Sequence, residues 1–499
     1  MNDERKIKSS FSAYTISLSI FFIFHSPFFI LHSLFSTFHF NMKRLSLFIL
    51  TFILHSTLCI LHSNAQSFDD YFVNKTLRLD YTFSGTATEQ HIAVDELCQT
   101  DGWYGKRQNL ADVPIEGNGQ VIVRVHNKDK VIYRNSFSTL FQEWQSYDEA
   151  KEKARSFENV FIVPMPKDTV DVTLQLMDNR RQVVASLTHV VVPTDILIRH
   201  LAVKGTTPYD VLQKAENPDK CINIAFVAEG YKDTEMPTFI ADAQEAIDAL
   251  FQHEPFKSLR SRFNIVAVKS TSVDSGTSEP AKDIWLNTAL HSNFDTFYSS
   301  RYLTTLHLKD LHNILAGIPY EHIIVLVNSD RYGGGGILNS YNLSTTHHQY
   351  YRQVVVHEFG HSFAGLADEY AYENEQIPMY PHDIEPWEKN ITTLVDFNGK
   401  WENKIDEKAW KTKEGTWSPN SEAWNHDNGK PQLKASKKSK KSKKAITNDE
   451  QIGLYEGAGY SLTGVYRACP DCRMRTNQNP EFCPACRKAL TDLINFYTE

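Results

Sequence analysis

The chain has 499 residues, 41% of them hydrophobic and 22% charged, which suits a folded protein of two or three domains. A formal net charge of -8 gives no reason to expect a nucleic-acid partner. The one strongly basic stretch, residues 434–445, is low in complexity. We interpret it as a solvated loop, with contact to an anionic surface as the alternative.

Residues 42–65 have the order of a secretory signal peptide. A basic pair after Met42 precedes an apolar run over residues 45–61, and Ser63 and Ala65 are small residues where a cleavage site requires them. We expect cleavage after Ala65 and export of the mature chain. Its final location could be secreted, periplasmic or at the cell surface.

Residues 1–41 precede this signal, and we interpret them as a mis-assigned upstream extension. The alternative is a membrane anchor over residues 11–35, but His25, Pro27 and His32 interrupt that apolar run. We therefore expect no stable membrane span in the mature chain.

Residues 66–200 are predicted to form an accessory domain with an antiparallel β-sandwich. Apolar and polar residues alternate in its predicted strands, and Gly, Asn, Asp and Pro separate them. Strands of this kind are typical of two packed antiparallel sheets. They span residues 76–85, 119–127, 169–178 and 182–192.

Residues 201–499 are predicted to form the second domain, of mixed α/β type. Three apolar runs, at residues 221–231, 263–270 and 322–329, are predicted to be buried strands. Helices are expected at residues 235–252 and near 302–316. Strands that alternate with helices indicate an α/β layer, so the chain as a whole is expected to be a multidomain α+β and α/β protein.

Residues 371–450 are predicted to be an irregular insertion in this domain, rich in tryptophan and lysine. The tryptophans could form a binding platform for sugar or peptide. We favour the simpler interpretation that they pack a loop-rich subdomain. They are Trp387, Trp401, Trp410, Trp417 and Trp424.

The sequence VVVHEFGHSFAGLADEY, residues 354–370, carries the chemistry. His357 and His361 are four residues apart, so on a helix both imidazoles lie on one face and can bind one zinc ion. Glu358 follows the first histidine and can act as general base toward water. Two surface histidines on a solvated helix are the alternative, which the residues that follow make weak.

Asp368 is the expected third metal ligand. Gly365 can end the helix and return the chain so that Asp368 reaches the metal. Two histidines and one carboxylate leave a fourth position for water, as a catalytic zinc site needs. Glu369 is the competing third ligand.

The stretch resembles the metzincin zinc peptidases, although its glycine and third ligand each come one position later than in their usual pattern. The variant HExxHxxxGxxDE followed by Tyr370 is similar to the immunoglobulin A peptidase family of bacterial metallopeptidases. Other segments over residues 221–490 agree with that family, as does a strand-rich N-terminal domain. They are AEGY, SGTSEP, the YGG before the active-site helix, and YEGAGY, YR, CRMR and FCPAC at residues 455–486.

The resemblance implies further roles. Metzincins place a methionine in a tight turn beneath the zinc, and Met474 is the candidate here, with an ordinary core methionine as the alternative. A tyrosine often assists such sites as an electrophile or extra ligand, so Tyr460 and Tyr466 are candidate stabilisers of the transition state. The family's name does not tell whether this chain cleaves immunoglobulin A.

An edge strand is expected near residues 337–343, after four glycines at 333–336. An extended peptide substrate can add to an exposed sheet edge, and glycines would let the backbones approach closely. A flexible loop is the alternative.

The cysteines at residues 469–486 follow the pattern CPDC-x10-CPAC, which is typical of a zinc ribbon in a cytosolic protein. Because cysteines in exported proteins tend to oxidise, we favour at least one disulfide here, for example between Cys472 and Cys483. A structural zinc ion is the alternative.

These patterns together predict an exported zinc-dependent metallopeptidase. We expect an endopeptidase that acts on protein or peptide substrates such as a host glycoprotein. Zn²⁺ is the expected cofactor. Two alternatives stay open: a binding or adhesion protein with a peptidase-like domain, and a zinc amidase that acts on glycopeptides or the cell wall.

Overall fold

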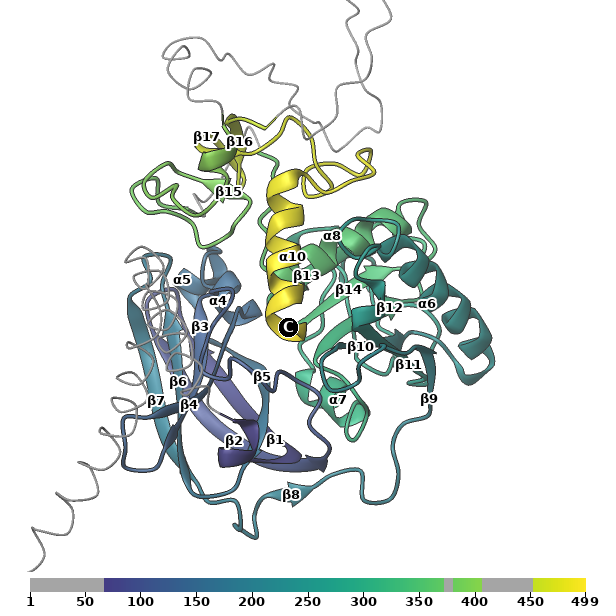
Figure 1. Cartoon of the computed structure of the whole chain (residues 1–499). Coiled ribbons are helices and arrows are strands. Elements are labelled where there is room, and N and C mark those ends of the chain that lie inside the picture. Colours follow the sequence, from purple (N-terminus) through teal and green to yellow (C-terminus); the bar gives the residue numbers. More distant parts are fainter. Residues whose placement is uncertain (1–66, 372–379, 406–451) are drawn as a thin grey trace, which may run out of the picture. The chain divides into compact units, whose positions relative to one another are not determined.

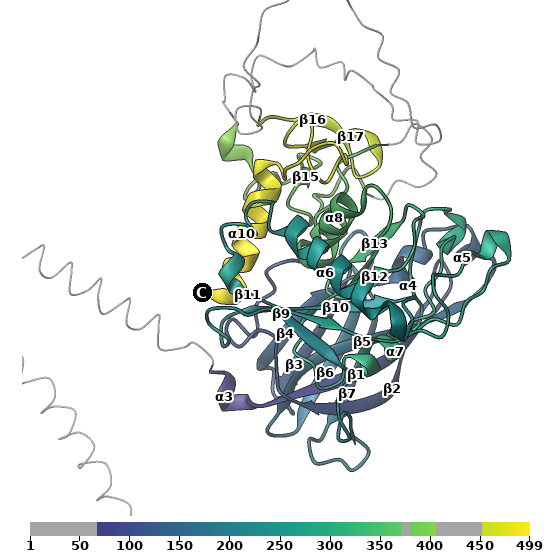
Figure 2. The same cartoon turned by 90° about the vertical axis from the view of Figure 1, so that its right-hand side faces the viewer.

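The computed structural model describes residues 67–371, 380–405 and 452–499 (Figures 1 and 2). The residues in these three ranges belong to one compact unit. The predicted extension 1–41, the signal peptide 42–65 and most of the insertion 371–450, with its basic stretch, lie outside the described residues. Within the described ranges, no helix combines the length and hydropathy that a membrane span requires.

The N-terminal part of the described chain contains two four-stranded sheets. Their strand orders are β5-β1-β2-β8 and β4-β3-β6-β7, and all neighbours are antiparallel except β2 and β8. The strands are β1 (Phe72–Gly85), β2 (Gln90–Asp101), β3 (Gly119–Val125), β4 (Val131–Phe137), β5 (Arg155–Pro166), β6 (Val170–Met177), β7 (Val183–Val191) and β8 (Arg199–His200).

Side chains from both sheets share one core. The rings of Phe137 on β4 and Phe161 on β5 lie 4.2 Å apart between centroids, and Phe83 on β1 contacts both. Three short helices belong to this part of the chain; Thr139 caps the second by accepting from the Gln142 N–H. They are α3 (Phe68–Tyr71), α4 (Leu140–Trp144) and α5 (Glu149–Glu152).

A six-stranded sheet follows, in the order β13-β14-β12-β10-β11-β9. Strands β14, β12, β10 and β11 are parallel to one another, whereas the edge strands β13 and β9 are antiparallel to their neighbours. The predicted strands at 221–231, 263–270 and 322–329 are thus adjacent. The strands are β9 (Tyr209–Gln213), β10 (Ile222–Glu229), β11 (Phe263–Val268), β12 (His322–Val327), β13 (Gly334–Ile337) and β14 (Tyr341–Thr345).

The continuous apolar runs in these strands follow from burial on both faces of the sheet. In β10, Ala225 and Val227 belong to the same core as the N-terminal sheets. Ile224 and Phe226 point the other way, into a second core formed with the helices. Alternate residues of a strand face opposite sides, so most positions in β10 are apolar. Its two polar residues are hydrogen-bonded: Asn223 donates to the Tyr104 carbonyl, and Glu229 accepts from the Thr288 hydroxyl.

The helical face of the sheet carries α6 (Met236–Leu250), α8 (Tyr351–Ala364) and α10 (Pro484–Thr498) (Figure 1). Their buried residues join Met474 and four cysteines in that second core. Helix α7 (Leu308–Ile314) packs into the first core instead, and it is shorter than the predicted 302–316 helix. Short 3-10 turns, η1 to η5, span Asp233–Glu235, Arg260–Arg262, Pro280–Lys282, Thr296–Tyr298 and Glu402–Lys404.

A small fourth sheet has the order β15-β17-β16. Its turn between β16 and β17 contacts the segment after α8, because the Gly459 N–H donates to the Asp368 carbonyl. Its strands are β15 (Ile391–Thr392), β16 (Tyr455–Ala458) and β17 (Ser461–Arg467). Trp401, from the described part of the predicted insertion, is buried and donates its indole N–H to the Gly453 carbonyl. Packing therefore accounts for this tryptophan.

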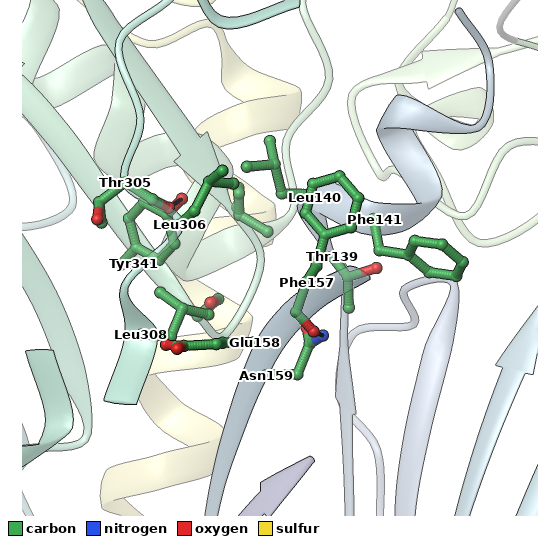
Figure 3. A pocket seen from close by; sticks show the side chains of 12 residues that line it. Thr139, Leu140, Phe141, Phe157, Glu158, Asn159, Thr305, Leu306, Leu308 and Tyr341 are labelled. Atoms are coloured by element: carbon green, nitrogen blue, oxygen red, sulfur yellow. Dashed lines mark hydrogen bonds between the residues drawn. The ribbon is translucent and has the colours of Figure 1, made fainter. Parts of the chain in front are cut away.

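A small pocket lies where α4 and β5 meet β14 and the segment before α7 (Figure 3). Half of its twelve lining residues are apolar, and the others are Glu158, Asn159 and four hydroxyl-bearing residues, Thr139, Thr305, Ser340 and Tyr341. None of the histidine, aspartate or cysteine residues singled out in the sequence lines it. The candidate site therefore lies elsewhere in the described chain.

Candidate metal centre

His357 and His361 lie together on one face of α8, as their spacing predicts. Their Nε2 atoms are 3.0 Å apart, and their ring centroids 4.7 Å apart. Both rings are partly exposed, whereas residues 354–356 on the same helix are buried. The helix thus fixes its apolar residues in the core and leaves the imidazole edges accessible.

Backbone carbonyls set the orientation of both rings. Nδ1 of His357 lies 3.0 Å from the Arg473 carbonyl, and Nδ1 of His361 lies 2.5 Å from the Leu366 carbonyl. A carbonyl can only accept a hydrogen bond, so Nδ1 carries the proton on each neutral ring. Both Nε2 atoms therefore present lone pairs to the same point, the arrangement of metal-ligating histidines.

Asp368 completes this group. Helix α8 ends at Gly365, which adopts a left-handed conformation with φ of 55°, and the chain then turns back across the histidines. Oδ1 of Asp368 lies 3.1 Å from His357 Nε2 and 3.3 Å from His361 Nε2. The Tyr460 hydroxyl donates to Oδ2, while the buried Oδ1 has no hydrogen-bond partner.

The donor set fits a divalent cation of the size of zinc. A tetrahedron with metal–ligand bonds of about 2.0–2.1 Å separates its ligand atoms by about 3.3 Å. The three atoms of His357, His361 and Asp368 are separated by 3.0–3.3 Å. Three lone-pair donors at that spacing, one of them an orphaned carboxylate oxygen, require positive charge between them.

The electrostatics of the cluster without a metal agree with this. Burial alone would lower the pKa of His361, but the Asp368 carboxylate raises it to about 9. Burial likewise opposes ionisation of Asp368, yet the two histidines hold the pKa of that carboxyl well below its usual range.

The side chain of Glu358 extends from α8 toward the edge strand β13. A Cβ built on Gly334 would come within 2.7 Å of Glu358 Oε1, and one built on Gly336 within 2.5 Å of the Glu358 carbonyl oxygen. Burial raises the pKa of Glu358, and the nearby histidines oppose that rise. The glycine run thus allows close approach of the strand to the helix, which a flexible loop would not need.

Met474 is fully buried against the underside of α8. Its sulfur would lie 2.7 Å from a Cβ on Gly360, so a larger residue at position 360 would force the methionine side chain to move. The carbonyl of the preceding Arg473 holds His357, and the Met474 carbonyl accepts from the Glu369 N–H. The turn at Met474 therefore contacts both the helix and the segment that carries Asp368.

Several sequence candidates lie elsewhere. Glu369, the competing third ligand, points away from the histidines toward Cys483 and Cys486. Tyr466 on β17 is hydrogen-bonded to Glu456, so of the two candidate tyrosines it is Tyr460 that contacts the ligand set. The structure has no disulfide between Cys472 and Cys483, the pair given as the example in the sequence prediction.

Sequence reasoning missed two residues near the centre, Glu143 and Tyr302. The Tyr302 hydroxyl donates to Glu143 at 2.6 Å, and Tyr302 forms a bridge with Gly334 on the outer side of β13. Burial raises the pKa of Glu143 to about 7, with smaller effects from Tyr302, His361 and Asp368. Glu143 comes from α4 of the N-terminal part, and no local motif signals its arrival here.

Comparison with known protein families gives two matches. Residues 211–494, more than half of the chain, match the family model described as IgA Peptidase M64. Residues 67–188 match the model described as Peptidase M64 N-terminus. No curated protein matches the chain. The predicted resemblance is confirmed: the chain belongs to the IgA peptidase M64 family, and it carries the group of candidate metal ligands that a metal-dependent peptidase needs.

Proposed function

We propose that this chain is an exported zinc endopeptidase in which His357, His361 and Asp368 hold the metal and Glu358 is the general base. The observation that carries the proposal is the convergence of two Nε2 atoms and the orphaned Oδ1 of Asp368 within 3.3 Å of one another. Membership of a peptidase family supports the choice of a peptide bond as the substrate.

Each residue has a distinct role. Bound zinc supplies a Lewis acid and lowers the pKa of water at the site toward neutrality. Glu358 takes a proton from the attacking water and returns it to the leaving amine. Its raised pKa favours that second step because the carboxyl group can hold the proton between the two transfers.

Tyr460 is a positioning residue in this proposal. Its hydroxyl donates to Oδ2 of Asp368 and leaves Oδ1 directed at the histidines. Hydrogen bonds of this kind fix a ligating carboxylate and hold it in its coordinating orientation. The Arg473 and Leu366 carbonyls do the same for the two imidazoles.

The edge strand β13 is the proposed docking site for the substrate backbone. It is the last strand of the six-stranded sheet, it is antiparallel to β14, and Glu358 lies over it at Gly334. A peptide that adds to this edge would gain backbone hydrogen bonds and pass beside the general base. The bridge from Tyr302 to Gly334 limits the length of strand that is free to pair.

The domain scheme belongs to the same proposal. Two sheets that share one core support a β-sandwich for residues 66–200, and the helix, glycine and methionine turn support a metzincin-like catalytic domain over residues 201–499. Export rests on the signal-like order of residues 42–65. Sequencing of the N-terminus of exported protein should give Gln66; a mature chain that retains residues 1–41 would overturn this part.

Cleavage profiling tests the function. Purified mature protein is incubated with a mixed peptide library and, in parallel, with glycopeptides and cell-wall fragments, and products are identified by mass spectrometry. We expect internal peptide bonds to be cleaved. Cleavage confined to the cell-wall amides would favour the amidase alternative, and binding without cleavage by metal-loaded protein would favour the adhesion alternative.

A further inference from the structure

A second group of metal-binding side chains lies on the other side of the segment that carries Asp368. Ligand atoms of Glu369, Cys472, Cys483 and Cys486 all lie within 4.8 Å of one another. Cys469 is within hydrogen-bonding reach of Cys483. The exposed fraction of each of these five side chains is 0%, so the group is closed to solvent.

The sulfur spacing is that of ligands around one metal ion. Sγ of Cys472 and Sγ of Cys486 are 3.8 Å apart. Zinc–sulfur bonds of about 2.3 Å in a tetrahedron separate the sulfurs by about 3.8 Å. A disulfide bond is about 2.05 Å long, so these thiols would have to move toward each other by almost half their separation to oxidise.

Backbone N–H groups converge on Cys472. Its Sγ accepts from the Cys483 N–H at 3.1 Å and from the Met474 N–H at 3.5 Å. Such bonds favour a thiolate, which is the form that binds metal. The bond from Cys483 also joins the two segments CPDC and CPAC, because Cys472 ends the first and Cys483 begins the second. Cys483 is the N-cap residue of α10, and Pro484 lies in the first turn of that helix.

We propose that this cluster is a structural zinc site in which Cys469, Cys472, Cys483 and Cys486 are the four ligands. Structural zinc sites are commonly four-cysteine tetrahedra with two residues between the members of each pair, as here. Glu369 lies against the cluster, with Oε1 3.1 Å from Cys486 Sγ and 3.0 Å from the Asn390 amide nitrogen. With four thiolates the proton of this contact would reside on the Glu369 carboxyl group, which would donate to Cys486 as a neighbour of the site. Cys469, which contacts Cys483, would supply the fourth sulfur ligand.

Nearby cations balance the charge of a zinc ion with four thiolates, which is -2. Arg467 is largely buried and interacts electrostatically with Glu369, and Arg473 does so with Cys472. Side chains of both arginines are held by backbone carbonyls, so they cannot move away from the cluster easily. An anionic tetrahedron is therefore accommodated in this buried position.

For the enzyme, the consequence is that zinc at the cysteines would stabilise the backbone segments that position the ligands of the histidine centre. Cys472 fixes the Met474 N–H, the Met474 carbonyl accepts from the Glu369 N–H, and Arg473 holds His357. Asp368 and Glu369 are consecutive residues that face the two sites in turn. Zinc at the cysteines would thus keep Met474, which lies beneath α8, and Asp368, the third ligand, in place.

Zinc content of the mature protein provides the first test. Elemental analysis of gently purified wild-type protein should give two zinc ions per chain. The His357→Ala/His361→Ala variant should keep one, which an organomercurial that binds thiolates should release, as followed with a chromogenic zinc indicator. A folded double-histidine variant that retains no zinc would overturn the proposal whatever the state of the catalytic centre.

Thiol chemistry provides the second test and needs no variant. Wild-type protein is unfolded with a chelator but without reductant, alkylated, and digested for mass spectrometry. We expect all four cysteines to be alkylated; peptides joined by disulfides among them would overturn the proposal.

A third test uses variants of the cluster. Cys472→Ser/Cys486→Ser should lose one zinc ion per chain and its thermal stability, whereas the matched Cys221→Ser should keep both, because Cys221 lies outside the cluster.

Discussion

The histidine centre and the cysteine cluster meet at the consecutive residues Asp368 and Glu369 but differ in access to solvent. The side chains of His357 and His361 are 15% and 17% exposed, whereas every side chain of the cysteine cluster is fully buried. An open metal site can admit water and substrate, and a closed one can only hold structure. The difference indicates which of the two groups performs chemistry and which stabilises the fold around it.

Chelation should separate the two sites with the largest effect, because it should remove metal from the histidine centre alone. Brief treatment with a chelator should abolish peptide hydrolysis and leave the near-ultraviolet circular dichroism unchanged, because the histidine centre is accessible and the cysteine cluster is not. Added zinc should restore activity. Full hydrolysis by protein from which all transition metal has been removed would show that no metal takes part.

The general base is the next target. Glu358→Gln should lower kcat by about 10²–10⁴-fold while zinc content and melting temperature stay near those of wild type. His361→Ala should lose activity together with the zinc of the histidine centre, and the exposed Glu216→Gln is the control for charge removal. Near wild-type turnover by Glu358→Gln would place the base at another residue.

Tyr460→Phe should have a smaller effect, confined to the histidine centre. Loss of the hydroxyl that donates to Asp368 should weaken zinc affinity or activity by about 10–100-fold, because ligand-orienting hydrogen bonds have effects of that size. Competition with a zinc-binding dye measures the affinity. Tyr466→Phe is the matched control, and a larger effect there than at Tyr460 would contradict the assignment.

Gly360→Ala should have the smallest effect on chemistry but a clear one on stability. The added methyl group would lie 2.7 Å from the Met474 sulfur, at the contact between the two metal-binding groups. Overpacking of this kind destabilises by about 1–3 kcal/mol, measurable by urea unfolding.

A double-mutant cycle shows whether that contact is responsible. Gly360→Ala combined with Met474→Ala should be less destabilised than the sum of the two single changes, because the second removes the obstacle to the first. Strict additivity would mean that Gly360 is required for another reason.

Local patterns predicted the elements that bear the histidine centre. The i, i+4 spacing places His357 and His361 on one face of α8, and Gly365 ends that helix in a left-handed conformation. The continuous apolar runs identified β10, β11 and β12, because strands of a sheet covered on both faces are mostly apolar. The edge strand was predicted near residues 337–343, but the strand at the edge is β13 (Gly334–Ile337), and β14 lies inside the sheet.

Two predictions differ from the structure, and in both cases long-range contacts decide the outcome. The sequence between residues 302 and 316 suggested one helix, but its first part pairs with β13 through Tyr302 and only Leu308–Ile314 is helical. The pairing of Cys472 with Cys483 was inferred from the compartment of the protein. Which sulfurs approach one another depends on the packing of α10 against the turn at Met474.

The amino-acid sequence by itself determined the family, the helix with its two histidines and the candidate base, because these depend on residues within one or two turns of each other. Only the tertiary structure decided that Asp368 faces the histidines and Glu369 the cysteines, that Tyr460 and not Tyr466 contacts Asp368, and that Glu143 reaches this region from the N-terminal sheets. Those outcomes follow from side chains that are distant along the chain and meet only when both cores have formed.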